Sequence, residues 1–370
     1  MKQLNNNIDA FLALVRAGLW EKEVQLSHLG SVDYTEIYRL ASEQTVVGLI
    51  AAGLEHMTDC KVPQDVALRF AGYTMQLEKR NLSMNQFIGD LMQRMNLSGV
   101  DALLVKGQGI AQCYERPLWR AAGDVDLFLD ETNYQKAKEL FRWVASSVKP
   151  EDDYTKHLSM TIGPWEVELH GNMRAGVTAR MDRLIDAVQA DTFDNHKIRI
   201  WDNGGAEVPL PSPDNDVIFI FTHILHHFYR GGIGLRQICD WCRLLYVYKD
   251  QIDRPLLKKR LENAAIVPEW KLFGAFAVKL LGMPEEAMPF YKEPKKNIMP
   301  ILDFMLETGN FGHNRDYSYY RKYPFLVRKA ISLWRKGGDI VHHFTLFPAN
   351  SFRYFFRFLS LGFLNAAKGK

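Results

Sequence analysis

Apolar residues recur at intervals of three and four through the first hundred positions, which is the spacing of one face of a helix. After position 100 this spacing gives way to short apolar runs and to strict alternation of apolar and polar residues, which is typical of β-strands. Helical spacing returns beyond position 212. The pattern therefore predicts helices over 8–20, 34–58 and 63–97, then a region of strands, then a second and larger helical part.

The alternating region predicts a small mixed sheet with helices, so we expect an α+β fold. Ser212 followed by Pro213 predicts the start of the next helix. Strands are expected at 102–105, 123–129, 157–162, 165–170, 197–201 and 207–210, with a helix at 131–144 whose inward residues include Val144. We divide the chain into a helical N-terminal region at 1–99, a core at 100–210, a helical domain at 211–310 and a tail at 311–370.

Two aspartates stand one residue apart in the strand at 123–129. Side chains alternate between the faces of a strand, so Asp124 and Asp126 point the same way while Val125 and Leu127 point into the core. Two like charges on one half-buried face repel each other and lose hydration. A divalent cation relieves that cost, and carboxylates plus substrate phosphates are the usual ligands of Mg²⁺. The pair therefore indicates a metal–phosphate site.

A lysine–glycine turn follows the apolar strand at 102–105. Lys106 brings a positive charge, and Gly107 lets a phosphate approach the backbone closely. The residues after the turn have the spacing of a helix start, where backbone N–H groups attract anions. Ordinary surface charge is the alternative interpretation of Lys106 and Arg120. The expected nucleotide contacts are Lys106, Gly107, Gln108 and Arg120.

The strand at 165–170 offers further carboxylates, because Glu166, Glu168 and His170 alternate with apolar residues and share one face. Together these segments resemble the nucleotidyltransferase superfamily related to DNA polymerase β, and within it an uncharacterised bacterial nucleotidyltransferase family. The resemblance covers about 100–172 and continues more loosely through 213–248. It is carried by Lys106, Gly107, Tyr114, Pro117, Arg120, Asp124, Asp126, Glu168 and His170.

The resemblance implies transfer of a nucleoside monophosphate from an NTP to an acceptor hydroxyl on a small molecule, sugar or protein. It implies Mg²⁺ or Mn²⁺ as cofactor, with Asp124, Asp126 and Glu168 as catalytic residues and metal ligands; Glu168 is preferred to Glu166 because it lies beside the histidine of the motif. The wider superfamily has Gly-Ser in the turn where this chain has Gln108 after the glycine, so a serine hydroxyl that commonly touches the phosphate is missing. A non-catalytic nucleotide-binding regulator is therefore an alternative.

The helical domain adds further candidate substrate contacts. His223 and His227 share one helix face, and Arg236 and Asp240 are four residues apart, the spacing of a helix-face ion pair. Simple packing is the alternative for all four. Cys239 and Cys242 read as consecutive turns of a buried helix, without zinc and without a disulfide. The expected substrate contacts are His170, His227, Arg236 and Asp240.

Composition adds an asymmetry of charge. The net charge is +3, but residues 311–370 hold eleven Lys and Arg against two Asp and Glu, together with fifteen aromatic residues. Those aromatics can pack the helical domain, lie on an anionic membrane or stack on nucleic acid, so a membrane-associated accessory protein of envelope polysaccharide synthesis is a second alternative. Four cysteines, a polar N-terminus and the lack of a transmembrane stretch of about 20 apolar residues predict a cytoplasmic protein.

Overall fold

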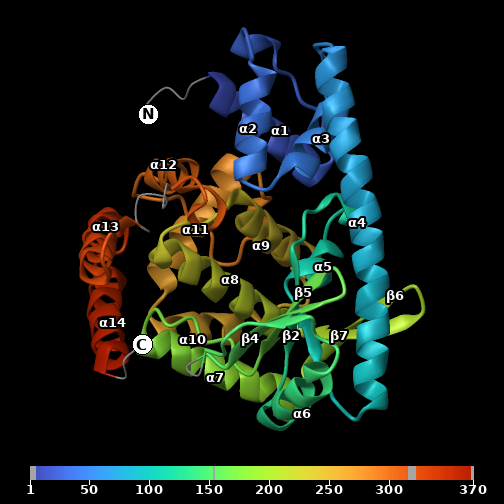
Figure 1. Ribbon diagram of the computed structural model, residues 1–370. Helices are drawn as coiled ribbons and strands as arrows, with labels where there is room; N and C mark the ends of the chain where they lie inside the picture. Colours follow the sequence, from blue (N-terminus) through green and yellow to red (C-terminus); the bar gives the residue numbers. More distant parts are fainter. Residues whose placement is uncertain (1–5, 153–154, 316–321, 368–370) are drawn as a thin grey trace.

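The N-terminal part of the molecule is helical. A computed structural model describes residues 6–152, 155–315 and 322–367 (Figure 1). The helices predicted at 8–20 and 63–97 are confirmed, but the single helix at 34–58 is wrong: it is broken at Thr45, whose φ of 59° lies in the left-handed region that a helix cannot contain. The four helices are α1 (Asn6–Trp20), α2 (Tyr34–Glu43), α3 (Val47–Glu55) and the long α4 (Gln64–Leu97).

Glycines allow α1 and α3 to pack with their backbones in contact. A Cβ atom on Gly18 would lie 1.9 Å from the carbonyl oxygen of Leu49, and one on Gly53 would lie 2.2 Å from that of Leu14. Neither distance leaves room for a side chain. The two positions therefore fix how closely these helices approach.

A five-stranded mixed sheet stands at the centre of the core region. Its strand order is β1-β2-β5-β4-β3, in which β2 and β5 are parallel and the other neighbours are antiparallel. The α+β fold class is thus confirmed. The short β3 was not predicted, because its two exposed residues show no alternation. The strands are β1 (Leu103–Val105), β2 (Asp124–Phe128), β3 (Ser147–Val148), β4 (His157–Ile162) and β5 (Trp165–His170), and β6 (Ile198–Asn203) and β7 (Ala206–Pro211) form a separate pair.

The sheet is covered by helices on both faces. Leu127 and Val167 are fully buried in a cluster that also contains Tyr134 of α6 (Glu131–Arg142). On the other face, the Phe128 ring lies 5.2 Å from that of Phe219 in α8 (Pro213–Arg230). The predicted inward position of Val144 is wrong: α6 ends at Arg142, and Val144 is 52% exposed.

Helices dominate the remainder of the described chain, and α8 crosses the middle of the molecule (Figure 1). It begins at Pro213 as predicted, but the Ser212 hydroxyl makes no capping hydrogen bond. The core here is aromatic, with Trp241 and Trp270 in edge contact at 4.9 Å. The helices are α7 (Ala179–Asp194), which was not predicted, α8 (Pro213–Arg230), α9 (Leu235–Val247), α10 (Arg254–Ala264), α11 (Val267–Leu281) and α12 (Met299–Thr308).

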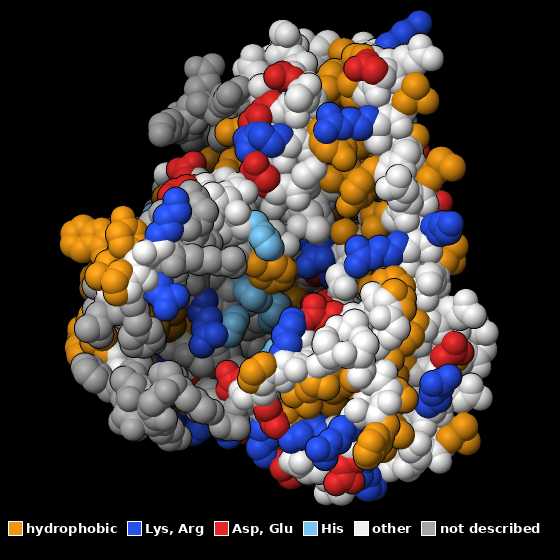
Figure 2. Space-filling view, in the orientation of Figure 1, with side chains coloured by type: hydrophobic (Ala, Val, Ile, Leu, Met, Phe, Trp, Pro, Cys, Tyr) orange, Lys and Arg blue, Asp and Glu red, His pale blue; other side chains and the backbone are white. Residues whose placement is uncertain are grey.

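The tail forms two helices, α13 (Phe325–Leu346) and α14 (Pro348–Ala367). The prediction that its aromatics pack inward is confirmed for Phe347 and Tyr354, each 2% exposed, and is wrong for Trp334, which is 84% exposed. Figure 2 shows hydrophobic side chains projecting on the side where Figure 1 places α13. Part of the predicted basic and aromatic run lies at 316–321, outside the described residues. In the described chain, no helix combines the length and the apolar character needed to cross a bilayer.

Candidate functional site

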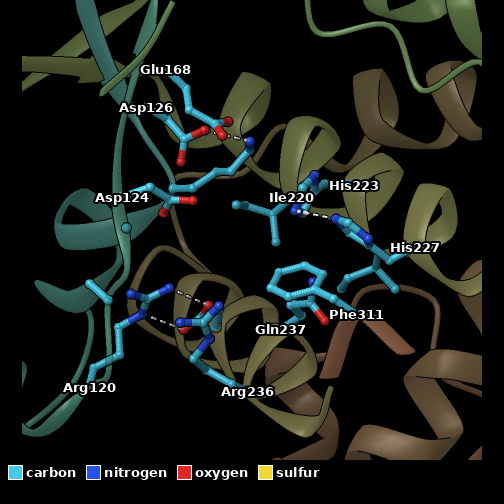
Figure 3. A pocket seen from close by; sticks show the side chains of 15 residues that line it. Arg120, Asp124, Asp126, Glu168, Ile220, His223, His227, Arg236, Gln237 and Phe311 are labelled. Atoms are coloured by element: carbon cyan, nitrogen blue, oxygen red, sulfur yellow. Dashed lines mark hydrogen bonds and ion pairs between the residues drawn. The ribbon is translucent and has the colours of Figure 1, made fainter. Parts of the chain in front are cut away.

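A cavity of about 240 Å³ lies between the carboxylate-bearing strands and the helices α8 and α9 (Figure 3). Histidine and basic side chains gather around the hollow on this face in Figure 2. Strand β2 and strand β5 supply its acidic wall, and α8 and α9 supply the opposite wall. The polar lining residues are Lys106, Arg120, Asp124, Asp126, Glu168, His223, His227, Arg236, Gln237 and Asp240.

Parallel pairing of β2 with β5 brings three carboxylates together. Asp126 stands opposite Glu168 in the register of the two strands, and Asp124 is two residues along the same face. All three line the cavity. Glu166 shares their face but pairs with Lys149 and accepts a 2.6 Å hydrogen bond from Ser159. The geometry therefore selects Glu168 over Glu166 as the third acid of the cavity.

Asp124 carries the clearest electrostatic sign of a cation site. The negative charge of Asp126, then burial, then Glu168 raise the pKa of Asp124 to about 6. Within the described chain its carboxylate has no hydrogen-bond donor and no ion-pair partner. A carboxylate that is crowded by like charges and left unpaired is suited to a divalent cation. The donor set of this wall therefore fits a metal bound by oxygen.

Asp126 is held by two partners. Lys106 Nζ lies 2.9 Å from Asp126 Oδ1, and His170 Nε2 lies 2.7 Å from the same oxygen. Burial favours the neutral acid, but Lys106 and His170 outweigh it and keep the pKa of Asp126 below its usual value. The Asp126 carboxylate is therefore charged and fixed in direction.

A second cluster, made of His157, Glu168 and His170, adjoins the acids. Glu168 Oε2 lies 3.0 Å from His157 Nε2 and 3.5 Å from His170 Nε2, and the two rings stack at 4.9 Å. One ligand atom from each residue lies within 4.8 Å of the others, so the cluster is also a candidate metal site. Burial opposes the charge on Glu168, but the two histidines hold its pKa well below the usual range.

Sequence reasoning missed His157. In the antiparallel pair β4–β5, His157 stands directly opposite His170. The sequence held a signal for this position. A tight hairpin between Ile162 and Trp165 fixes the register of the two strands, and counting back from the turn places His157 opposite His170.

The lysine–glycine turn is shorter than predicted, because the helix includes its glycine. Lys106 has a φ of 57°, and α5 (Gly107–Ala111) begins directly after it. Gln108 therefore points into the protein: it is 2% exposed and is not among the residues lining the cavity. Lys106 and Gly107 are the residues of this turn that line the cavity.

Arg120 and Asp240 form a buried pair across the base of the cavity. Arg120 donates from Nε and Nη2 to the two carboxylate oxygens of Asp240 at 2.8 and 2.7 Å, and the Tyr114 hydroxyl donates to Asp240 at 2.7 Å. The predicted Arg236–Asp240 ion pair is wrong, because Asp240 is already occupied by Arg120. Arg236 donates instead to the carbonyl oxygen of Ala121 at 2.5 Å.

His223 and His227 face the cavity from α8, as their predicted common face requires. Their Nε2 atoms lie 3.1 Å apart, and the His227 ring meets Phe311 at 4.6 Å. Burial, more than the neighbouring positive charges, places the pKa of both histidines well below the usual value. Both rings are therefore neutral, and a substrate would meet hydrogen-bonding groups here without charge.

Cys239 and Cys242 lie outside the cavity. Both are fully buried in α9, as predicted, and burial raises the pKa of each thiol. A buried thiol in its neutral form is a packing residue.

Comparison with known proteins gives three results. A family model described as uncharacterised nucleotidyltransferase matches residues 30–282, which include every polar residue of the cavity wall. No curated protein matches the chain. Among solved structures, the crystal structure of an antigenic nucleotidyltransferase-like protein from Paracoccidioides brasiliensis is similar at 15% sequence identity and a TM-score of 0.31, covering 54% of this chain and 92% of that chain.

Proposed function

This chain belongs to the family of uncharacterised nucleotidyltransferases, and we propose that it transfers a nucleoside monophosphate from an NTP to an acceptor hydroxyl, with Mg²⁺ or Mn²⁺ as cofactor. The acceptor oxygen bonds to the α-phosphorus, the bond between the α- and β-phosphates breaks, and pyrophosphate leaves. The hydroxyl proton passes to water. The observation that carries the proposal is the convergence of Asp124, Asp126 and Glu168 on one cavity.

The three carboxylates have separate roles in this proposal. Asp124 and Asp126 would hold the cation from β2, and Glu168 would add a third carboxylate oxygen from β5. When bound, the divalent cation supplies positive charge that neutralises the triphosphate and the leaving pyrophosphate. Oxygen donors of this kind suit Mg²⁺ and Mn²⁺.

The surrounding residues position these acids. Lys106 and His170 fix the direction of Asp126, and His157 does the same for Glu168. The hydroxyl proton is assigned to water, because the Glu168 carboxylate is already in contact with His157 and His170. Catalysis then rests on positioning and on charge stabilisation, and it needs no covalent nucleophile.

Transfer of label from α-³²P-NTP tests this function. The purified protein is incubated with each α-labelled NTP, Mg²⁺ or Mn²⁺ and cell extract, and label is followed into an acceptor. We expect label transfer with one NTP, and its loss in Glu168→Gln. The matched control is Glu166→Gln, an acid on the same strand and face that lies outside the cavity. Equal transfer by both variants would contradict the role of Glu168.

The burial of Gln108 favours a second candidate, a nucleotide-binding module without catalysis. No hydroxyl stands at this position of the turn, and the Gln108 side chain turns away from the cavity. Such a protein would bind NTP in the presence of Mg²⁺ and release no pyrophosphate. Measurement of pyrophosphate release by the same samples therefore separates the two functions.

The exposed aromatics of the tail favour a membrane-associated accessory role. Trp334, Phe352 and Phe356 are 84%, 57% and 52% exposed. Large apolar side chains exposed beside basic residues suit an anionic lipid surface. Co-sedimentation with anionic liposomes that disappears in a full-length variant with Trp334, Phe352 and Phe356 changed to Ser would support this role, and no co-sedimentation at low salt would exclude it.

A further inference from the structure

Arg236 is the cation of the cavity wall that has no acidic partner. Of the basic side chains described along this wall, Lys106 contacts Asp126 at 2.9 Å and Arg120 forms its bidentate pair with Asp240. Arg236 donates Nη1 to the carbonyl oxygen of Ala121, and this is the hydrogen bond that its side chain makes within the described chain. Its Nε is shielded from solvent and has no partner there.

The Arg236 side chain lines the cavity. Arg236 is the second residue of α9, and Figure 3 shows its side chain on the same wall as Gln237 and Arg120, across from the aspartates. The N-terminal backbone of α9 is not the anion site, because the N–H of Leu235 donates to the Gln44 side chain at 3.0 Å. Any attraction for an anion here therefore comes from the guanidinium.

An unpaired guanidinium is costly in this setting. Burial lowers the pKa of Arg236, and the like charge of Arg120 lowers it further, while Asp240 and Asp124 oppose the shift only in part. A charge shielded from water and left without a counter-ion destabilises the folded protein. A phosphate group in the cavity would supply the missing negative charge, since guanidinium groups bind phosphates with two parallel hydrogen bonds.

We propose that Arg236 is an anion-binding residue of this cavity, and that it contacts a phosphate group of the bound substrates. The inference rests on the proposed function for the identity of those substrates. The phosphate has two possible sources: the triphosphate of the NTP, or an anionic group on the acceptor. The contact also fits the charge of the cavity, because it places a cation across from the acids that hold the metal.

Binding of inorganic pyrophosphate tests the inference without requiring turnover. Calorimetry, with and without Mg²⁺, compares the wild type with Arg236→Gln, which retains a donor for the Ala121 carbonyl but loses the charge. The matched control is Arg94→Met, which removes an exposed arginine of α4. We expect Arg236→Gln to bind pyrophosphate about tenfold to hundredfold more weakly, the usual range for a lost charged hydrogen bond, and the control to bind it as the wild type does.

A second measurement identifies the source of the phosphate. It determines how much cell extract is needed for half-maximal labelling of the acceptor at saturating NTP. If Arg236→Gln retains pyrophosphate affinity but needs at least tenfold more extract, the anion belongs to the acceptor. If neither quantity changes, the inference is wrong. It is also wrong if Arg236→Gln fails to fold, because an unpaired charge should not be needed for stability.

The two proposals can fail separately. Label transfer that is equal in Arg236→Gln and wild type leaves the nucleotidyl transfer standing and removes Arg236 from it. Pyrophosphate binding that depends on Arg236, in a protein that transfers no label, leaves the anion site standing and removes the transfer.

Discussion

Replacing Asp124 by Asn should stabilise the metal-free protein at neutral pH. The folded state raises the pKa of this carboxyl from 3.8 to about 6, first through the charge of Asp126. At about 1.4 kcal/mol for each pH unit, that difference corresponds to at most about 3 kcal/mol of the free energy of unfolding. Partial hydration at the cavity wall reduces it, so we expect a gain of about 1–3 kcal/mol for Asp124→Asn.

The sign of the pH dependence follows from the same shift. An acid whose pKa is raised by folding destabilises the native state only when it is ionised there. Below about pH 4 the carboxyl is neutral in both states and the two proteins should be equally stable with respect to this group. The penalty grows between about pH 4 and 6 and is complete above that. The advantage of Asp124→Asn should therefore appear across this interval.

Urea unfolding in the presence of a chelator, from pH 4 to 8, measures the effect. The control is Asp90→Asn, which removes an exposed aspartate of α4 that does not line the cavity. Adding Mn²⁺ should stabilise the wild type and narrow or reverse the difference, because the variant has lost a ligand. A variant that is less stable than the wild type at pH 7 without metal would refute the argument that Asp124 is an unpaired, repelled carboxylate.

Three further predictions concern binding, packing and the tail. Asp126→Asn should weaken divalent-dependent NTP binding more than about tenfold in equilibrium dialysis, and unchanged affinity would exclude Asp126 as a ligand. Gly18→Ala should lower the free energy of unfolding by at least about 1–3 kcal/mol, because its Cβ would lie 1.9 Å from the Leu49 carbonyl oxygen; a neutral result would contradict this packing. Removing 322–370 should cause aggregation by uncovering the ring of Phe228, which lies 5.9 Å from that of Phe347, and a soluble, equally stable product would show that the tail is not part of the core.

The strands of the fold could be predicted because alternation is a local signal. The strand Trp165–His170 and its burial pattern follow directly from single-residue alternation. The break at Thr45 could not be found in this way, because no glycine or proline marks this residue, whose φ is positive. The Ser212 hydroxyl likewise fails to cap α8 although the residue pattern is favourable. The Ser212 hydroxyl is instead buried without a hydrogen-bond partner in the described chain.

The residues of the acidic wall could also be placed from local pattern, because Asp124 and Asp126 share a strand face and line the cavity. Contacts between residues that are distant in the sequence could not be predicted in this way. Arg120 and Asp240 are 120 residues apart and meet only because α9 packs against the segment before β2. This contact also leaves Arg236 without an acidic partner in the described chain. Helix spacing predicted that Arg236 would pair with Asp240, but Asp240 is bound by Arg120.

The location of a bound metal is the most direct test of the central claim. Crystals grown with Mn²⁺ and a non-hydrolysable NTP analogue would reveal the metal by its anomalous scattering. We predict one peak bonded to Asp124 and Asp126, or two peaks about 3.5–4 Å apart that also engage Glu168, with the phosphates on the same side. A single peak bound by His157 and His170, with Asp124 free of metal, would contradict the account.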